Sequence, residues 1–216
     1  MKDITKNEMF RDLIKRACRN QIHFDTVLAD NWFGSKDNMR FIHEDVKKRF
    51  IIGIKSNRTV ATCENERQNK QYRQVKTLEM KDGQIRQVWL KGLSVPVVLL
   101  KKVFKNKDGA TGTIFLVSND LSIDAEGMYD LYQKRWKIEE FHKSIKQNAS
   151  LSKSPTKVVR SQQNHIFGSI FAYCKLEMLK LKTSLNHFAL KYKLILRANQ
   201  IAFQEFRNLK TGVLTA

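Results

Sequence analysis

One segment of the sequence gathers residue types that suit chemistry on a phosphodiester: Tyr132, Arg135, Glu139 and Lys146. At about 100° per residue of an α-helix, these four side chains fall within an arc of about 60°. Arg binds phosphate oxygens through paired hydrogen bonds, and Lys adds a point charge. Glu repels phosphate unless a divalent cation lies between them. The pattern fits a metal-dependent phosphodiester site or, equally well, a solvated helix face with an Arg135–Glu139 ion pair.

The elements that would position these four side chains, called the stripe below, are mostly helical. The segment from Asp124 to about Gln147 predicts one long helix, with Ile138 and Phe141 on a separate apolar arc. A loop around Pro155 follows. Two further helices are predicted over roughly 158–181 and 185–208.

The N-terminal part alternates helices and strands. Thr5 and Glu8 form the pattern of a capping box, and apolar residues at helical spacing predict a helix over roughly 5–20. The run Phe24–Ala29 then predicts a short strand that ends at Asp30. Taken alone, Asp30 is a turn residue between a strand and a helix.

A second helix is expected behind a Ser35 cap, and Phe50–Ser56 predicts a second buried strand. From Asn57 to Asp120 the pattern changes, because turn residues such as Asp82-Gly83 separate runs of β-type residues. We expect an all-β insertion there.

The charge balance points to a polyanion as partner. The 216 residues carry 40 Lys and Arg against 21 Asp and Glu, a net charge of +19. No run of about 18 apolar residues and no signal-peptide segment is present, which favours nucleic acid over membrane. Cys18, Cys63 and Cys174 lack the spacing of a zinc site, and an odd number of cysteines fits a reducing cytoplasm.

The motif Tyr132-x2-Arg135-x3-Glu139-x6-Lys146 resembles the YREK signature of bacterial insertion-sequence DDE transposases, the insertion-sequence-four group. All four residues and all three spacings match. The order of elements agrees as well, since an acid after a strand is followed by a β-rich insertion and then by the signature helix. The resemblance covers nearly the whole chain.

This resemblance implies an α/β fold with an RNase H-like catalytic core, in which three carboxylates hold two divalent ions, Mg²⁺ or Mn²⁺. It assigns Asp30 as the second catalytic and metal-binding acid and Glu139 as the third. The implied reaction is DNA transposition by strand cleavage and transfer.

The same resemblance implies DNA-binding residues. Tyr132, Arg135 and Lys146 match positions that contact the transposon-end backbone, and Lys143 is expected to add a weaker phosphate contact. Trp32 either stacks on a displaced base or is a buried core residue.

The first acid of the family is missing. Only 29 residues precede Asp30, too few for a helix and three strands, and Asp25 on the same strand is expected to face the other way. We therefore expect an N-terminally truncated protein whose core lacks its first strands. The expected parts are a partial core over 1–56, the β-rich insertion over 57–120 and a helical part over 121–216.

Two functions remain open for such a chain. It is a transposase fragment that is inactive alone, or a non-catalytic DNA-binding remnant that modulates full-length copies by occupying ends or forming mixed oligomers. An unrelated RNA-binding protein is disfavoured, because RNP-type aromatics and a KH-type loop are absent.

Overall fold

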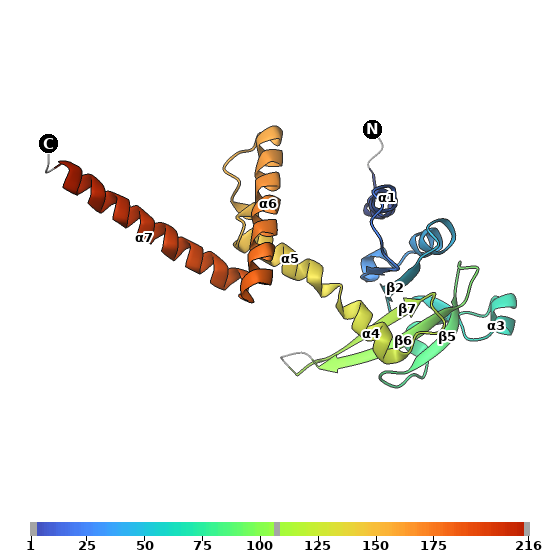
Figure 1. Cartoon of the computed structure of the whole chain (residues 1–216). Coiled ribbons are helices and arrows are strands. Elements are labelled where there is room, and N and C mark those ends of the chain that lie inside the picture. Colours follow the sequence, from blue (N-terminus) through green and yellow to red (C-terminus); the bar gives the residue numbers. More distant parts are fainter. Residues whose placement is uncertain (1–3, 106–108, 214–216) are drawn as a thin grey trace. The chain divides into compact units, whose positions relative to one another are not determined.

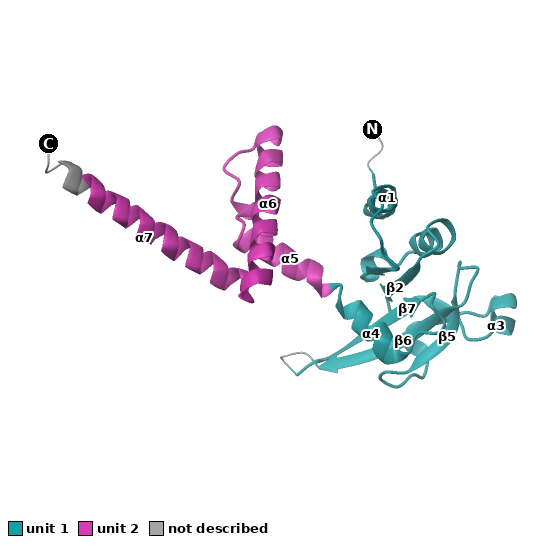
Figure 2. Ribbon diagram, viewed as in Figure 1, with its two compact units in different colours: residues 1–135 teal, residues 136–216 magenta. Residues whose placement is uncertain are grey.

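The computed structural model describes residues 4–105 and 109–213, with side chains up to residue 209. The chain divides into two compact units, residues 1–135 and residues 136–216 (Figure 2). Each unit is described by itself below.

Unit 1 begins with α1, Lys6–Arg19, and its start confirms the predicted capping box. Thr5 Oγ1 accepts a hydrogen bond from the Glu8 N–H at 3.3 Å, and the Glu8 carboxylate accepts from the Thr5 N–H at 2.8 Å. Both bonds satisfy donors that the first turn of a helix otherwise leaves open.

A seven-stranded, mostly antiparallel sheet forms the centre of unit 1 (Figure 1). Its strands in spatial order are β1 (Thr26–Ala29), β2 (Arg49–Ile54), β7 (Thr111–Ser118), β6 (Val97–Lys105), β5 (Ile85–Leu90), β3 (Thr59–Ala61) and β4 (Arg73–Gln74). Among the strands of the described residues, only β1 and β2 run parallel, from the pair Thr26 and Arg49 to the pair Ala29 and Ile52. Among the described residues, β1 pairs with β2 alone.

The connection between these parallel strands consists of three short helical elements: η1 (Asn31–Phe33), α2 (Lys36–Arg40) and the π-helix η2 (Phe41–Asp45). The predicted Ser35 cap is confirmed, since Ser35 Oγ accepts from the Asn38 N–H at 3.1 Å. A parallel pair needs such a crossover, because both strands must start at the same edge of the sheet.

The predicted insertion is rich in β-structure, and β5, β6 and β7 extend the same sheet as β2. The expectation that it is all-β was wrong, because α3, Glu64–Gln68, lies within it. Glu66 accounts for this helix: its carboxylate accepts from the Thr62 N–H at 2.6 Å, which satisfies a donor beside the first turn.

The two faces of the sheet carry separate cores. Phe50 and Ile52 of β2 face the cluster under α1 and α2, whereas Ile51 faces the cluster under α4, Ala125–Gln133. This alternation is the period of two of a β-strand. The connection of β1 to β2 therefore lies over one face and α4 over the other.

The long helix predicted from Asp124 to Gln147 is in fact two helices, α4 and α5, Trp136–Gln147. The break falls at Lys134 and Arg135, whose N–H groups donate to the Leu131 and Tyr132 carbonyls at 3.1 and 3.0 Å. These bonds span three residues instead of four and tighten the last turn of α4. The predicted continuous stripe is thus divided, with Tyr132 and Arg135 in unit 1 and Glu139 and Lys146 in unit 2.

Unit 2 confirms the two predicted C-terminal helices. They are α6, Val159–Thr183, and α7, His187–Val213, and a short turn, η4 (Leu151–Lys153), links α5 to α6. Ser184 ends α6 in the left-handed region, with φ of 57°. Among the described residues no helix has the length and apolar character needed to cross a membrane.

Candidate active site

Asp30 sits at the carboxyl end of β1, where the strand turns into η1. Its Oδ1 accepts the Trp32 N–H at 2.9 Å, which caps η1 and ends the strand. The side chain is half-buried. Its other oxygen, Oδ2, makes no hydrogen bond to any residue within 4–105 or 109–213, so it is the oxygen available to a cation.

Tyr132 reaches the same place from α4. Its side chain is 5% exposed, and a Cβ placed on Gly53 would lie 3.3 Å from its hydroxyl oxygen. The same Cβ would lie 3.4 Å from the carbonyl carbon of Asp30. The fold therefore brings the Tyr132 hydroxyl and the Asp30 backbone together over Gly53.

Sequence reasoning missed Gly53, although a signal for it exists. A glycine inside an apolar strand, here Phe50 to Lys55, commonly marks a close approach of another chain segment. At this position the approaching groups are a backbone turn and a hydroxyl, so the missing side chain leaves room for both.

Arg135 joins this group through Tyr132. The carbon at the centre of its guanidinium lies 5.5 Å from the centroid of the Tyr132 ring, within the range of a cation–π contact. Three of the predicted site residues, Asp30, Tyr132 and Arg135, are thus neighbours or near neighbours within unit 1.

Trp32 follows Asp30 and is 59% exposed, so of the two alternatives the buried core Trp is excluded and base stacking stays a prediction. The Lys6 Nζ lies 5.3 Å from its ring centroid. An exposed indole beside a cation offers a face on which a base can stack.

Asn38 is a further residue of this region that the sequence did not single out. It is fully buried, and its Nδ2 donates to the Phe33 carbonyl at 3.0 Å and to Asn7 Oδ1 at 2.7 Å. Its Oδ1 accepts from Arg11 at 2.8 Å. These bonds tie the η1 turn, and so Asp30 and Trp32, to α1.

Asp25 and Asp120 lie at the opposite end of the strands from Asp30. Asp25 precedes β1, and Arg49 beside it forms an ion pair of 3.0 Å with Asp120. Both acids therefore lie at the start of β1 and β2, whereas Asp30 lies at the end of β1. A hydrogen bond from Ser122, followed by the contact with Arg49, outweighs burial and holds the pKa of Asp120 below its usual range.

The remaining predicted residues lie on α5 in unit 2. Glu139, Lys143 and Lys146 are exposed and follow one another at intervals of four and three residues, so they share one face of the helix. Lys143 Nζ lies 5.8 Å from the Phe188 ring centroid at the start of α7.

The donor chemistry of Asp30 and Glu139 fits a hard divalent ion such as Mg²⁺, which prefers carboxylate oxygens supplemented by water and phosphate. Within the parts of the chain that are described, no three His, Cys, Asp or Glu residues gather into a metal-binding group.

The family model described as "Transposase DDE domain" matches residues 2–175. This match spans most of the chain, and the chain belongs to that family. No curated protein matches the sequence. The family generally uses divalent metal ions, and its partner is DNA.

Proposed function

We propose that this chain is a fragment of an insertion-sequence transposase of the YREK group, built for metal-dependent DNA strand cleavage and transfer. The observation that carries the proposal is the packing of Tyr132 against the Asp30 turn over Gly53, with Arg135 beside the Tyr132 ring. Tyr132 of the YREK pattern thereby lies beside the acid assigned to the same site, and Arg135 lies beside Tyr132.

Asp30 and Glu139 are the proposed ligands of Mg²⁺ or Mn²⁺. When held there, such ions would supply activation of the attacking oxygen and stabilisation of the leaving one. Arg135, Lys143 and Lys146 provide cations for DNA phosphates, and buried Tyr132 positions Arg135.

The crossover between β1 and β2 supports an RNase H-like core, because Asp30 stands at the carboxyl end of one strand of a parallel pair. In open α/β sheets this edge is where ligands bind. We retain the division into a partial core over 1–56, an insertion over 57–120 and a helical part over 121–216 as part of the proposal.

We also propose that the first acid comes from a polypeptide segment outside these 216 residues, so that this chain alone does not cleave DNA. Neither Asp25 nor Asp120 is placed to serve as the first acid, since both lie at the opposite end of the strands from Asp30. A non-catalytic chain that binds DNA and modulates full-length copies is the second candidate, and the exposed cations of α5 favour it.

Titration calorimetry with Mn²⁺ tests the metal assignment. Wild type is expected to bind the ion, and Asp30→Ala and Glu139→Ala are each expected to abolish binding. Asp25→Ala is the matched control, because it removes an exposed acid from the other end of β1. Binding that survives both site variants, or no binding by wild type, would refute the assignment.

A nicking assay on transposon-end DNA tests the proposed inactivity. No Mg²⁺-dependent nicking is expected from the purified chain. Nicking that Glu139→Ala abolishes would show that the chain holds a complete site.

A further inference from the structure

Three cations lie together where β2 passes into the β-rich insertion. Lys55 directly follows β2, Arg58 directly precedes β3, and Lys76 lies on η3, Val75–Thr77. Lys55 and Lys76 are exposed, and Arg58 is half-buried. These three residues are called the basic corner. They lie outside the YREK pattern and outside the candidate active site described above.

Main-chain hydrogen bonds hold the basic corner together. The Arg58 N–H donates to the Lys55 carbonyl at 3.0 Å, which closes the turn between β2 and β3. The Lys76 N–H donates to the Ser56 carbonyl at 2.9 Å, and the Val75 N–H donates to the Arg58 carbonyl at 2.8 Å. Val75 is fully buried in the core cluster that lies under α1 and α2. These bonds fix the segments that carry the three cations relative to each other.

The side chains of the basic corner have no acceptor within residues 4–105 and 109–209, the part of the chain whose side chains are described. They form no ion pair and no hydrogen bond there. The carboxylate of Glu66 on α3 is already occupied, because it accepts from Thr62 and pairs with Arg73. Burial lowers the pKa of the Arg58 guanidinium from its usual value, with no opposing contribution from a carboxylate among these residues.

Arg58 differs in this respect from comparable residues of unit 1. The other half-buried arginines described in the unit all contact a partner within the protein, and they are Arg11, Arg67, Arg86 and Arg135. A guanidinium taken partly out of water costs free energy unless an acceptor replaces the lost hydration. Arg58 bears this cost without compensation in the folded chain, and an anion from outside would supply the missing acceptor.

The basic corner lies at the same end of the sheet as Asp30. Asp30 follows β1 and is level with Gly53 in the parallel register of β1 and β2. Lys55 comes two residues after Gly53, about 7 Å further along the strand direction. The turn after Asp30 lies over this end of β2 as well, because a Cβ on Gly34 would lie 2.7 Å from the Gly53 carbonyl oxygen. One stretch of DNA, which carries a phosphate charge about every 1.7 Å of its axis, is therefore long enough to contact both places.

We propose that the basic corner binds neighbouring phosphates of a DNA backbone that continues to Asp30. Arg58 binds one phosphate through paired hydrogen bonds, and the ammonium groups of Lys55 and Lys76 add point charges for the phosphates beside it. This inference rests on the proposed function only in placing DNA at Asp30. It gives the β-rich insertion a role of its own, which is to hold DNA with residues outside the YREK pattern.

Fluorescence anisotropy with a DNA duplex at several salt concentrations tests the basic corner. Arg58→Ala is expected to weaken binding about tenfold and to reduce the slope of log affinity against log salt by about 1. Arg58→Lys keeps the charge without the paired hydrogen bonds, so it is expected to retain the slope and part of the affinity. Arg16→Ala is the matched control, because Arg16 is an exposed arginine of α1 and its removal changes the net charge equally. Equal weakening by Arg58→Ala and Arg16→Ala would overturn the proposal, since it would report net charge alone.

The stability of the free protein separates a binding role of Arg58 from a structural one. Arg58→Met keeps an unbranched apolar stem and removes the half-buried charge. Without DNA, this variant is expected to unfold at the same temperature as wild type or at a higher one, because the uncompensated charge is gone. It is expected to bind DNA as weakly as Arg58→Ala. A lower unfolding temperature, or the DNA affinity of wild type, would contradict the proposal.

Inorganic phosphate distinguishes a DNA backbone from a single anion as the ligand. Phosphate is expected to shift the unfolding temperature of wild type and of Arg58→Ala equally, because a DNA backbone offers several phosphates to the three cations and free phosphate offers one. A saturable shift in wild type alone would identify a small-anion site and would exclude DNA as the ligand. None of these results depends on a metal ion or on strand cleavage. Absence of Mn²⁺ binding with a retained effect of Arg58→Ala would refute the metal assignment and leave the basic corner in place.

Discussion

At the scale of single residues, the candidate site depends on Gly53, which has no side chain. Gly53 leaves space on β2 for both the turn after Asp30 and the Tyr132 hydroxyl. The two segments that carry these residues are far apart in sequence and meet only because β2 lies between them. Tight packing of this kind makes even one added methyl group costly.

Gly53→Ala is expected to destabilise unit 1 by about 1–3 kcal/mol, because the new Cβ would lie 3.0 Å from the Asn31 nitrogen and 3.3 Å from the Tyr132 hydroxyl. Urea unfolding measures the change. Gly168→Ala is the control, since nothing lies within 4 Å of that position on α6 and alanine favours helix. Adding Tyr132→Phe to Gly53→Ala should recover part of the loss. A neutral Gly53→Ala would contradict the close approach.

Asn38 gives a second prediction at this scale. Asn38→Ala removes the amide of a fully buried side chain, which accepts one hydrogen bond and donates two. Arg11 and the Phe33 carbonyl each lose their bond to that amide. The free energy of unfolding is expected to fall by about 1–3 kcal/mol. Asn69→Ala removes an exposed side-chain bond from the residue after α3 to Asn65 and should change the free energy of unfolding by less than about 0.5 kcal/mol. Equal effects of the two substitutions would argue against the role of Asn38 in holding the η1 turn on α1.

At the scale of elements, a polar cluster connects the three helices of unit 2. Ser144 of α5 lies 2.7 Å from His187 Nδ1 of α7, and Glu177 of α6 lies 3.3 Å from His187 Nε2. The Tyr173 hydroxyl donates to Glu177 at 2.8 Å. Since these groups are partly or fully buried, their mutual bonds orient α7 on α6.

This cluster predicts a loss of stability in alkali. Burial, followed by the bond and charge of Glu177, raises the pKa of Tyr173 to about 12. The pKa is about 10 in an unfolded chain, so folding favours the neutral phenol and this contribution is complete below pH 10. It is lost as the pH rises from 10 towards 12. Thermal unfolding between pH 9 and 12 should show the decline, and Tyr173→Phe should flatten it. An equally steep decline in Tyr173→Phe would contradict this assignment.

At the scale of the whole molecule, the net charge of +19 is expected to govern any encounter with DNA. Each phosphate contact releases counterions, so the logarithm of the binding constant falls linearly with the logarithm of the salt concentration. Substituting one contacting cation reduces that slope by about 1.

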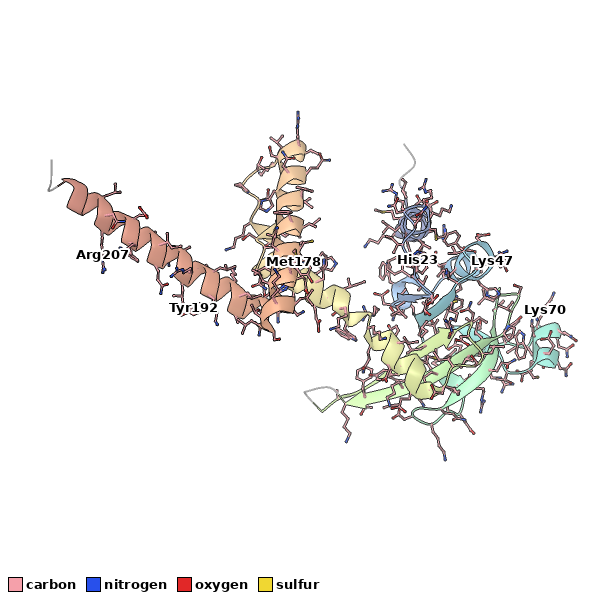
Figure 3. All side chains as sticks on the ribbon, viewed as in Figure 1. His23, Lys47, Lys70, Met178, Tyr192 and Arg207 are labelled. Carbon is pink, nitrogen blue, oxygen red and sulfur yellow. The ribbon has the colours of Figure 1, made fainter. Side chains whose placement is uncertain are left out.

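Binding to duplex DNA is therefore expected to weaken steeply between about 50 and 200 mM salt. Lys146→Ala should reduce the slope by about 1, as measured by fluorescence anisotropy. Lys70→Ala is the control, because it removes a cation of unit 1 that lies outside the proposed site (Figure 3). A salt-independent affinity would exclude phosphate contacts as the basis of binding.

The sequence by itself determined the features that depend on neighbouring residues. The Thr5 and Glu8 cap, the strand that ends at Asp30 and the two C-terminal helices all follow from local hydrogen bonds and apolar spacing. The family likewise follows from the sequence, since the family model matches residues 2–175 directly.

The tertiary structure alone decided where distant segments meet. The approach of the Tyr132 hydroxyl to Asp30 over Gly53 depends on how α4 packs against the sheet, which no local period encodes. The same holds for the exposure of Trp32. Local bonds fix an element, whereas contacts between elements are selected by the burial and close packing of the whole unit.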